Sequence, residues 1–244
     1  MRVHVAATAQ ELGLAAAQEF ARISSEAAHA RDWCFVALAG GSTPRALYRA
    51  LADTAALRSH VPWNRMHFFW GDERHVPPDH ADSNYRMVHE TLLENVPVNP
   101  EQIHRIRAEQ PDAGEAARAY DAEILKTLPH DAAPPRFDLI LLGLGNDGHT
   151  ASLFPDTPAL LEQRRLCVDN WVERLHTNRI TMTYPLLNAA RAVLFMVSGA
   201  DKAGIVRDVL RPANGDRVFP AQRVRPDGEL LWMLDRDAAS AMET

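Results

Sequence analysis

The segment DLILLGLGNDGHTASLFPDTP, residues 138–158, joins a strand-like apolar run to a glycine-rich turn and says most about the fold. The apolar run 137–143 is the clearest candidate for a buried central strand in the chain. Gly143, Gly145 and Gly148 follow it with the G-x-G-x-x-G spacing of a dinucleotide-binding loop. The turn therefore indicates either a cofactor loop or a loop that presents a catalytic group.

The prolines after this turn argue against a dinucleotide site. Such a site needs a regular helix after its third glycine, Gly148, but Pro155 and Pro158 leave room for no more than a short turn. Asp147 and His149 flank that glycine, and a base with its orienting carboxylate is the favoured interpretation. A histidine that only forms hydrogen bonds within the turn is the alternative.

Segments typical of strands and helices alternate along the rest of the chain. This alternation predicts a doubly wound α/β fold, a Rossmann-like three-layer arrangement with a mostly parallel sheet and helices on both faces. Thr8 and Glu11 form a capping-box pattern at the start of the first helix. The expected strands are 33–39, 66–70, 137–143, 192–199 and 230–235. The expected helices are 9–30, 82–94, 111–128, 200–210 and one within 40–51 that has Pro44 in its first turn. Loops are expected at 95–110 and 211–228.

The composition fits one globular domain spanning 1–244. With 244 residues, of which 46% are hydrophobic, the chain is long enough for a large core. The net charge of −6 argues against nonspecific binding to nucleic acid, and no apolar run approaches the ~20 residues of a membrane span. The N-terminus does not resemble a signal peptide, so we expect a cytoplasmic protein whose cysteines, Cys34 and Cys167, are buried free thiols. We expect a monomer or a small homo-oligomer.

Four polar loops marked by glycine follow expected strands: GGSTP (40–44), GDER (71–74), GLGNDGH (143–149) and SGADK (198–202). The carboxyl ends of parallel strands in such folds meet at one edge of the sheet, and ligands bind there. We therefore expect the four loops to line one crevice that holds a single active site.

The loop 40–44 indicates a phosphate site. Gly40 and Gly41 permit close approach of the backbone, and the N–H groups at a helix N-terminus favour an anion. Ser42 and Thr43 add hydroxyl donors, although both residue types also serve as ordinary helix caps. The loop is not a P-loop, because the G-K-[ST] ending is missing.

Charged residues in the other loops extend the expected crevice. Asp72 is a candidate base or substrate-binding carboxylate, and Arg74 can bind a carboxylate or stabilise an oxyanion, although a solvated charged turn would look similar. Arg179 and Lys202 can complete a phosphate clamp with the loop 40–44, although each alone is more often a surface charge. Neither a metal nor a covalent nucleophile is expected, because the histidines lack metal-ligand spacing and no G-x-S-x-G or H-E-x-x-H occurs.

Together these motifs resemble the 6-phosphogluconolactonase family of the glucosamine/galactosamine-6-phosphate isomerase-like superfamily. The resemblance runs from about residue 33 to residue 239, through LAGGSTPRALYRAL, FFWGDERHVPPDHADSNYRM, FDLILLGLGNDGHTASLFPDTPAL, RITMT, VLFMVSGADKAGIV and PAQRVRPDGELLWMLDRDAA. One departure is LHTNRIT (175–181), where family members often carry prolines just before the arginine. The resemblance implies hydrolysis of 6-phospho-D-glucono-1,5-lactone to 6-phospho-D-gluconate in the oxidative pentose phosphate pathway, without a cofactor or metal.

The resemblance also implies a role for each candidate residue. His149 matches the family's general base, Asp147 lies in the same motif, and Arg74 matches the arginine of the D-E-R loop. The loop 40–44, Arg179 and Lys202 match the positions that bind the phosphate.

Two rival functions remain open at this point. A glucosamine-6-phosphate deaminase or isomerase would carry a Glu five residues after its motif histidine, where this chain has Phe154. A non-catalytic sugar-phosphate binding module would keep the phosphate loop and lose the turn that contains Asp147 and His149.

Overall fold

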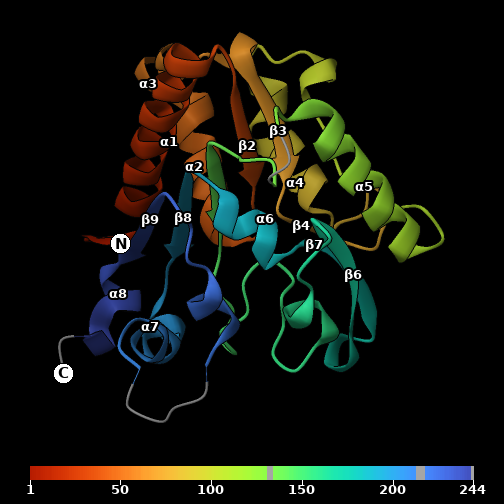
Figure 1. Ribbon diagram of the computed structural model, residues 1–244. Coiled ribbons are helices and arrows are strands. Elements are labelled where there is room, and N and C mark those ends of the chain that lie inside the picture. The colour runs from red at the N-terminus through yellow and green to blue at the C-terminus, as the bar shows by residue number, and fades with distance from the viewer. Residues whose placement is uncertain (131–133, 213–217, 243–244) are drawn as a thin grey trace.

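A six-stranded sheet forms the centre of the computed structural model, which describes residues 1–130, 134–212 and 218–242 (Figure 1). Every neighbouring pair in this sheet is parallel. The fold is therefore the doubly wound α/β class that the sequence predicts, with all five expected strands and one more at its edge. In spatial order the strands are β3 (Met66–Trp70), β2 (Cys34–Leu38), β5 (Leu139–Leu142), β8 (Ala192–Val197), β9 (Glu229–Asp235) and β1 (Arg2–Ala6).

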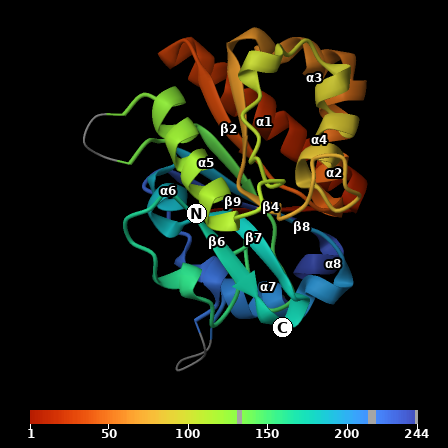
Figure 2. The same cartoon turned by 90° about the vertical axis from the view of Figure 1, so that its right-hand side faces the viewer.

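Helices cover both faces of this sheet. Figure 2 shows α1 (Ala9–Arg31) and α2 (Ser42–Asp53) on one side, with α5 (Ala113–Thr127) and α6 (Tyr184–Ala189) on the other. The remaining helices are α3 (Ala55–His60), α4 (Asn84–Thr91), α7 (Ala203–Leu210) and α8 (Arg236–Ala239). Single 3₁₀ turns are Trp63–Arg65, Leu93–Asn95, Pro100–Gln102, Pro158–Leu161, Glu173–Leu175, Ala200–Lys202, Pro220–Arg223 and Ser240–Met242.

The apolar runs of the sequence become strands because both faces of the sheet are covered. All residues of β2, β5 and β8 are buried, as expected for central parallel strands. Cys34 and Cys167 are buried free thiols, as expected. Within the described residues, no helix is long and apolar enough to cross a membrane.

The order in which the chain adds strands to the sheet reverses between β2 and β5, although the strands stay parallel. From β2 the chain continues outward to β3 at one edge, and it then returns to β5, which pairs with the other side of β2 through Val36 and Leu139. In open α/β sheets such a reversal leaves a crevice at the carboxyl ends of the two strands, since their loops diverge to opposite faces. The loops after β2 and β5 are 40–44 and 143–149, so the topology brings the phosphate-loop candidate beside the catalytic-turn candidate.

A second, antiparallel sheet of three strands is not among the sequence predictions. It contains β4 (Asp72–Arg74), β7 (Thr177–Met182) and β6 (Cys167–Val172), in that order. Residues 71–74 are predicted as a loop, because a three-residue strand shows no period of its own. Arg74 in β4 lies directly opposite Arg179 in β7, because the two residues are partners in the register of this sheet.

Smaller differences concern element ends. The predicted helix 82–94 ends at Thr91 and is followed by a 3₁₀ turn. The predicted loop 95–110 contains a 3₁₀ turn and a bridge from Ile103 to Phe68, and part of the predicted loop 211–228, residues 213–217, lies outside the described residues. The capping box at Thr8 is present in shifted form: the Glu11 carboxylate accepts from Ala7 N rather than Thr8 N.

Candidate active site

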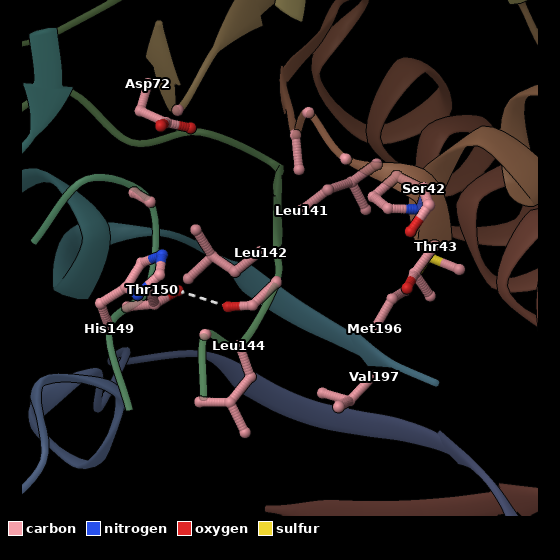
Figure 3. Close-up of a pocket in the computed structure, with 18 of the residues that line it drawn as sticks. Ser42, Thr43, Asp72, Leu141, Leu142, Leu144, His149, Thr150, Met196 and Val197 are labelled. Carbon is pink, nitrogen blue, oxygen red and sulfur yellow. Dashed lines mark hydrogen bonds between the residues drawn. The ribbon is translucent and has the colours of Figure 1, made fainter. Parts of the chain in front are cut away.

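A cleft of about 280 Å³ lies at the carboxyl ends of β2 and β5. All four glycine-marked loops contribute to its wall, so they meet in one place. Figure 3 shows the His149 ring on one side of the cleft and Ser42 and Thr43 on the opposite side. The candidate residues that line the cleft are Gly40, Gly41, Ser42, Thr43, Asp72, Arg74, His149 and Lys202. Asp147 and Arg179 do not line it.

The loop after β2 leaves the start of α2 open. Gly41 precedes the helix with φ 101°, a conformation that favours glycine, and space around its Cα is free. Gly40 must also be glycine, because a Cβ there would lie 1.7 Å from Oδ1 of Asn84. No side chain in the described part of the protein caps the first turn of α2. Its free N–H groups, beside the hydroxyls of Ser42 and Thr43, form a site for an anion.

His149 and Asp147 form a hydrogen-bonded pair in the turn after β5. Nδ1 of His149 lies 2.5 Å from Oδ1 of Asp147, and the backbone N–H of His149 donates to the same oxygen at 3.2 Å. Because a carboxylate only accepts hydrogen bonds, Nδ1 carries a proton, and in the neutral ring Nε2 is then an acceptor. Among the described residues, no hydrogen-bond partner of Nε2 is found, and the ring lines the cleft.

Two neighbours fix the position of the imidazole. The Phe154 ring stacks on it, with 4.1 Å between ring centroids. On the backbone side, Gly145 leaves room for the ring, since a Cβ there would lie 2.0 Å from Cε1 and Nδ1 of His149. Gly145 is therefore needed to make room for the His149 ring. In a dinucleotide loop, the glycine at the same place in the motif instead lets the backbone approach the pyrophosphate.

Asp147 is ionised at neutral pH. Burial by itself would raise the pKa of this carboxyl, but the hydrogen bonds from His149 and the charges of His149 and Arg174 outweigh it and lower the pKa to about 2. Nη2 of Arg174 lies 2.6 Å from Oδ2 of Asp147. Both oxygens of the carboxylate are therefore engaged, one by the imidazole and one by a guanidinium.

Arg74 and Arg179 are cross-strand partners in the second sheet, and their like charges interact. Nε of each is buried and has no hydrogen-bond partner among the described residues. Nη1 of Arg74 donates to the backbone oxygen of Asp82 at 2.5 Å. Burial, and then the neighbouring charge of Arg74, lower the pKa of Arg179. Two adjacent cations with unused donors indicate that an anion is expected beside them.

The acidic residues of the GDER loop have different surroundings. Asp72 lines the cleft and accepts a hydrogen bond from Oγ of Ser152 at 2.6 Å. Glu73 is buried and accepts from the backbone N–H groups of Arg74, Asn84 and Tyr85, each at 2.8 Å. Glu73 therefore joins β4 to the start of α4, and of the two carboxylates only Asp72 reaches the cleft.

Lys202 lines the cleft beside the turn after β5. Its Nζ donates to Oδ1 of Asn146 and lies 3.9 Å from Asp201. The preceding Gly199 adopts φ 104°, and its N–H donates to the buried carboxylate of Asp235 at 3.1 Å. The turn that carries Lys202 is thereby tied to the end of β9.

Several residues of the site are absent from the sequence-based candidates: Asn84, Ser152, Phe154 as a stacking partner, and Arg174. Ser152 and Phe154 belong to the central segment 138–158, so their closeness to His149 in the sequence could have predicted a place in the site. Asn84 and Arg174 come from other elements and carry no local signal. Within the described residues, no group of three or more His, Cys, Asp or Glu side chains is arranged to hold a metal ion.

Comparisons with known proteins find relatives over most of the chain. A family model described as Glucosamine-6-phosphate isomerases/6-phosphogluconolactonase matches residues 7–232. A 6-phosphogluconolactonase of Synechocystis sp. is 43% identical over 205 residues, covering 83% of this chain and 82% of the relative, and one of Nostoc sp. is 41% identical over 211 residues, covering 85% and 84%. The solved structure of 6-phosphogluconolactonase from Trypanosoma brucei has a TM-score of 0.86 and 32% identity, covering 98% of this chain and 97% of that chain.

Proposed function

Because this chain belongs to the glucosamine-6-phosphate isomerase and 6-phosphogluconolactonase family, we propose that its cleft hydrolyses 6-phospho-D-glucono-1,5-lactone to 6-phospho-D-gluconate, a step of the oxidative pentose phosphate pathway. The enzyme is a 6-phosphogluconolactonase, a carboxylic ester hydrolase. The observation that carries the mechanism is the His149 ring, whose Nδ1 is held by Asp147 and whose Nε2 has no partner in the described structure.

His149 is the proposed general base. Nε2 takes a proton from a water molecule, the water oxygen bonds to the lactone carbonyl carbon, and the carbonyl π electrons move to its oxygen. When the tetrahedral intermediate collapses, the bond to the ring oxygen breaks and Nε2–H returns the proton to that oxygen. The Asp147 carboxylate stabilises the imidazolium that exists between the two transfers and keeps the required tautomer.

A backbone N–H near the base is the proposed donor to the oxyanion. Ala151 lines the cleft two residues after His149 and adopts φ 47°, in the left-handed region that costs a residue with a Cβ roughly 1–2 kcal/mol. No hydrogen bond from its N–H is found within the described ranges. Strain of this kind at a cleft supports a functional role, and a fixed N–H dipole stabilises charge as it develops.

The proposed phosphate site includes Ser42 and Thr43, which lie across the cleft from His149. The open start of α2 with Ser42 and Thr43 supplies neutral donors, and Arg74 and Lys202, which line the cleft, supply positive charge. Arg179 adds its charge as the cross-strand partner of Arg74. The unused donors of both arginines favour the phosphate over the transient oxyanion as the partner of Arg74, because a bound dianion neutralises the pair in every state of the reaction. Binding at a distance from the carbonyl positions the lactone for attack.

The rival activity of a deaminase is disfavoured by Phe154. The acidic residue expected there in a deaminase is replaced by an aromatic ring that stacks on His149 at 4.1 Å. A monomeric glucosamine-6-phosphate deaminase of the same fold has a TM-score of 0.80 but only 22% identity, which bears on the fold alone. A non-catalytic module is disfavoured by the intact His149–Asp147 pair.

The deciding experiment measures acid release from freshly generated 6-phosphogluconolactone beside ammonia release from glucosamine 6-phosphate. Acid release is expected, and His149→Ala is expected to lower kcat by about 10²–10⁴-fold, the usual contribution of a general base. Arg179→Met is expected to raise KM at least about tenfold with kcat little changed, because it removes binding made equally throughout the reaction. Ammonia release without acid release would overturn the activity, and wild-type kcat in His149→Ala would overturn the base.

A further inference from the structure

Two side chains, Phe154 and Arg174, stack against the catalytic pair of His149 and Asp147. The Phe154 ring lies on the His149 ring with 4.1 Å between centroids, and Cζ of Arg174 lies 5.1 Å from the Phe154 centroid. The Arg174 guanidinium also reaches past this ring to Asp147, with 2.6 Å between Nη2 and Oδ2. Arg174 is thus joined to both groups that hold the imidazole, by charge to the carboxylate and by a cation–π contact to the aromatic ring.

We propose that Arg174 is a positioning residue for catalysis, which sets the orientation of the Asp147 carboxylate and, through it, the imidazole of His149. The inference rests on the proposed roles of that pair. It adds a function to a residue in a different element, the turn Glu173–Leu175 between β6 and β7.

The geometry explains how Arg174 acts through Asp147. The carboxylate binds His149 through Oδ1 alone, and without a second contact it is free to rotate about its Cβ–Cγ bond. The ion pair at Oδ2 removes that freedom and holds the carboxylate against Nδ1. A guanidinium suits this task because its planar group can bind a carboxylate oxygen while its face covers an aromatic ring.

A purely structural ion pair would behave differently. The Arg174 side chain is 55% exposed, and exposed ion pairs contribute little to folding. The protein offers a matched control: Arg207 pairs with Asp208 at 2.7 Å, its side chain is 52% exposed, and it does not line the cleft. Removing either arginine is expected to leave the melting temperature nearly unchanged, and only Arg174 is expected to affect turnover.

The test is a double-mutant cycle on the full-length enzyme, with kcat and KM for lactone hydrolysis measured for wild type, R174M, D147N and D147N/R174M. R174M is expected to lower kcat about tenfold with KM within about twofold, because orientation of the base matters in the transition state. In the D147N background the same change is expected to lower kcat by less than about twofold. R207M is expected to match wild type.

Two results would overturn the proposal. The first is a kcat of R174M within about twofold of wild type, and the second is an equal tenfold loss in both backgrounds, which would show that Arg174 does not act through Asp147. If circular dichroism shows R174M to be poorly folded, R174Q takes its place in the same cycle. Failure of the proposed base is recognised separately, since D147N and His149→Ala would then keep wild-type kcat.

Discussion

Replacing Gly145 with alanine tests whether the imidazole must lie where the structure places it. A Cβ at this position lies 2.0 Å from two atoms of the His149 ring, whereas ordinary contact begins at 3.4 Å, so the ring must move by about 1.4 Å. That movement breaks the 2.5 Å hydrogen bond to Asp147 and the stacking on Phe154. Misplacement of a reacting group by about 1 Å costs on the order of 10²-fold, so kcat is expected to fall about 10²–10³-fold, or about 3–4 kcal/mol of transition-state stabilisation.

The assay for G145A follows acid release from freshly generated lactone with a pH indicator, corrected for hydrolysis without enzyme. KM is expected to stay within about threefold of wild type, because Ser42 and Thr43 of the proposed phosphate site lie across the cleft from His149. G204A serves as the control, since a Cβ at Gly204 in α7 meets open space and its kcat is expected to be unchanged. A folded G145A enzyme with kcat within about threefold of wild type would refute the reasoning, because the imidazole would then tolerate displacement.

Three further tests address charge, packing and reactivity. The pKa of Asp147 is about 2, below the ~3.9 of an unfolded aspartate, so this carboxylate contributes about 2 kcal/mol of stability above pH ~4 that is lost as pH falls toward 2. The difference between wild type and D147N in the free energy of urea unfolding is therefore expected to shrink over that pH range. A difference that stays constant would contradict this expectation. Asp138→Ala is expected to lower the free energy of urea unfolding by about 1–3 kcal/mol, because it leaves the buried Phe35 N–H without its acceptor and removes ion pairs with two half-exposed arginines. The kcat is expected to stay within about twofold, and a large loss of kcat would contradict the separation of Asp138 from the cleft. Burial raises the pKa of Cys34 and Cys167, so mass spectrometry is expected to find both modified by iodoacetamide only in denaturant, and labelling of the native protein would count against it.

The sequence predicts the fold and one wall of the site well, because both depend on local signals. Runs such as 137–143 reveal buried parallel strands, and the turn with Asp147 and His149 carries its chemistry within a few residues. That the four loops share one cleft follows from the rule for strand ends in doubly wound sheets. The roles of individual side chains within the cleft stay predictions, as do the single-domain assignment, the cytoplasmic location and the oligomeric state.

The parts that the sequence does not predict depend on register between distant segments. Arg74 meets Arg179 because a three-residue strand pairs with a segment about a hundred residues later, and no periodicity announces so short a strand. Arg174 reaches Asp147 only because the turn between β6 and β7 folds back toward the loop after β5. The edge strand β1 is similarly hidden, since most of its residues are exposed and its length is five residues.

The pairing of β1 with β9 joins the two extremes of the chain. Arg2 lies beside Leu231 in the register, and β9 is the neighbour of β1 in the sheet, so β1 has no native partner strand until β9 has been synthesised. During that interval the partly apolar segment Arg2–Ala6 must avoid pairing with foreign strands.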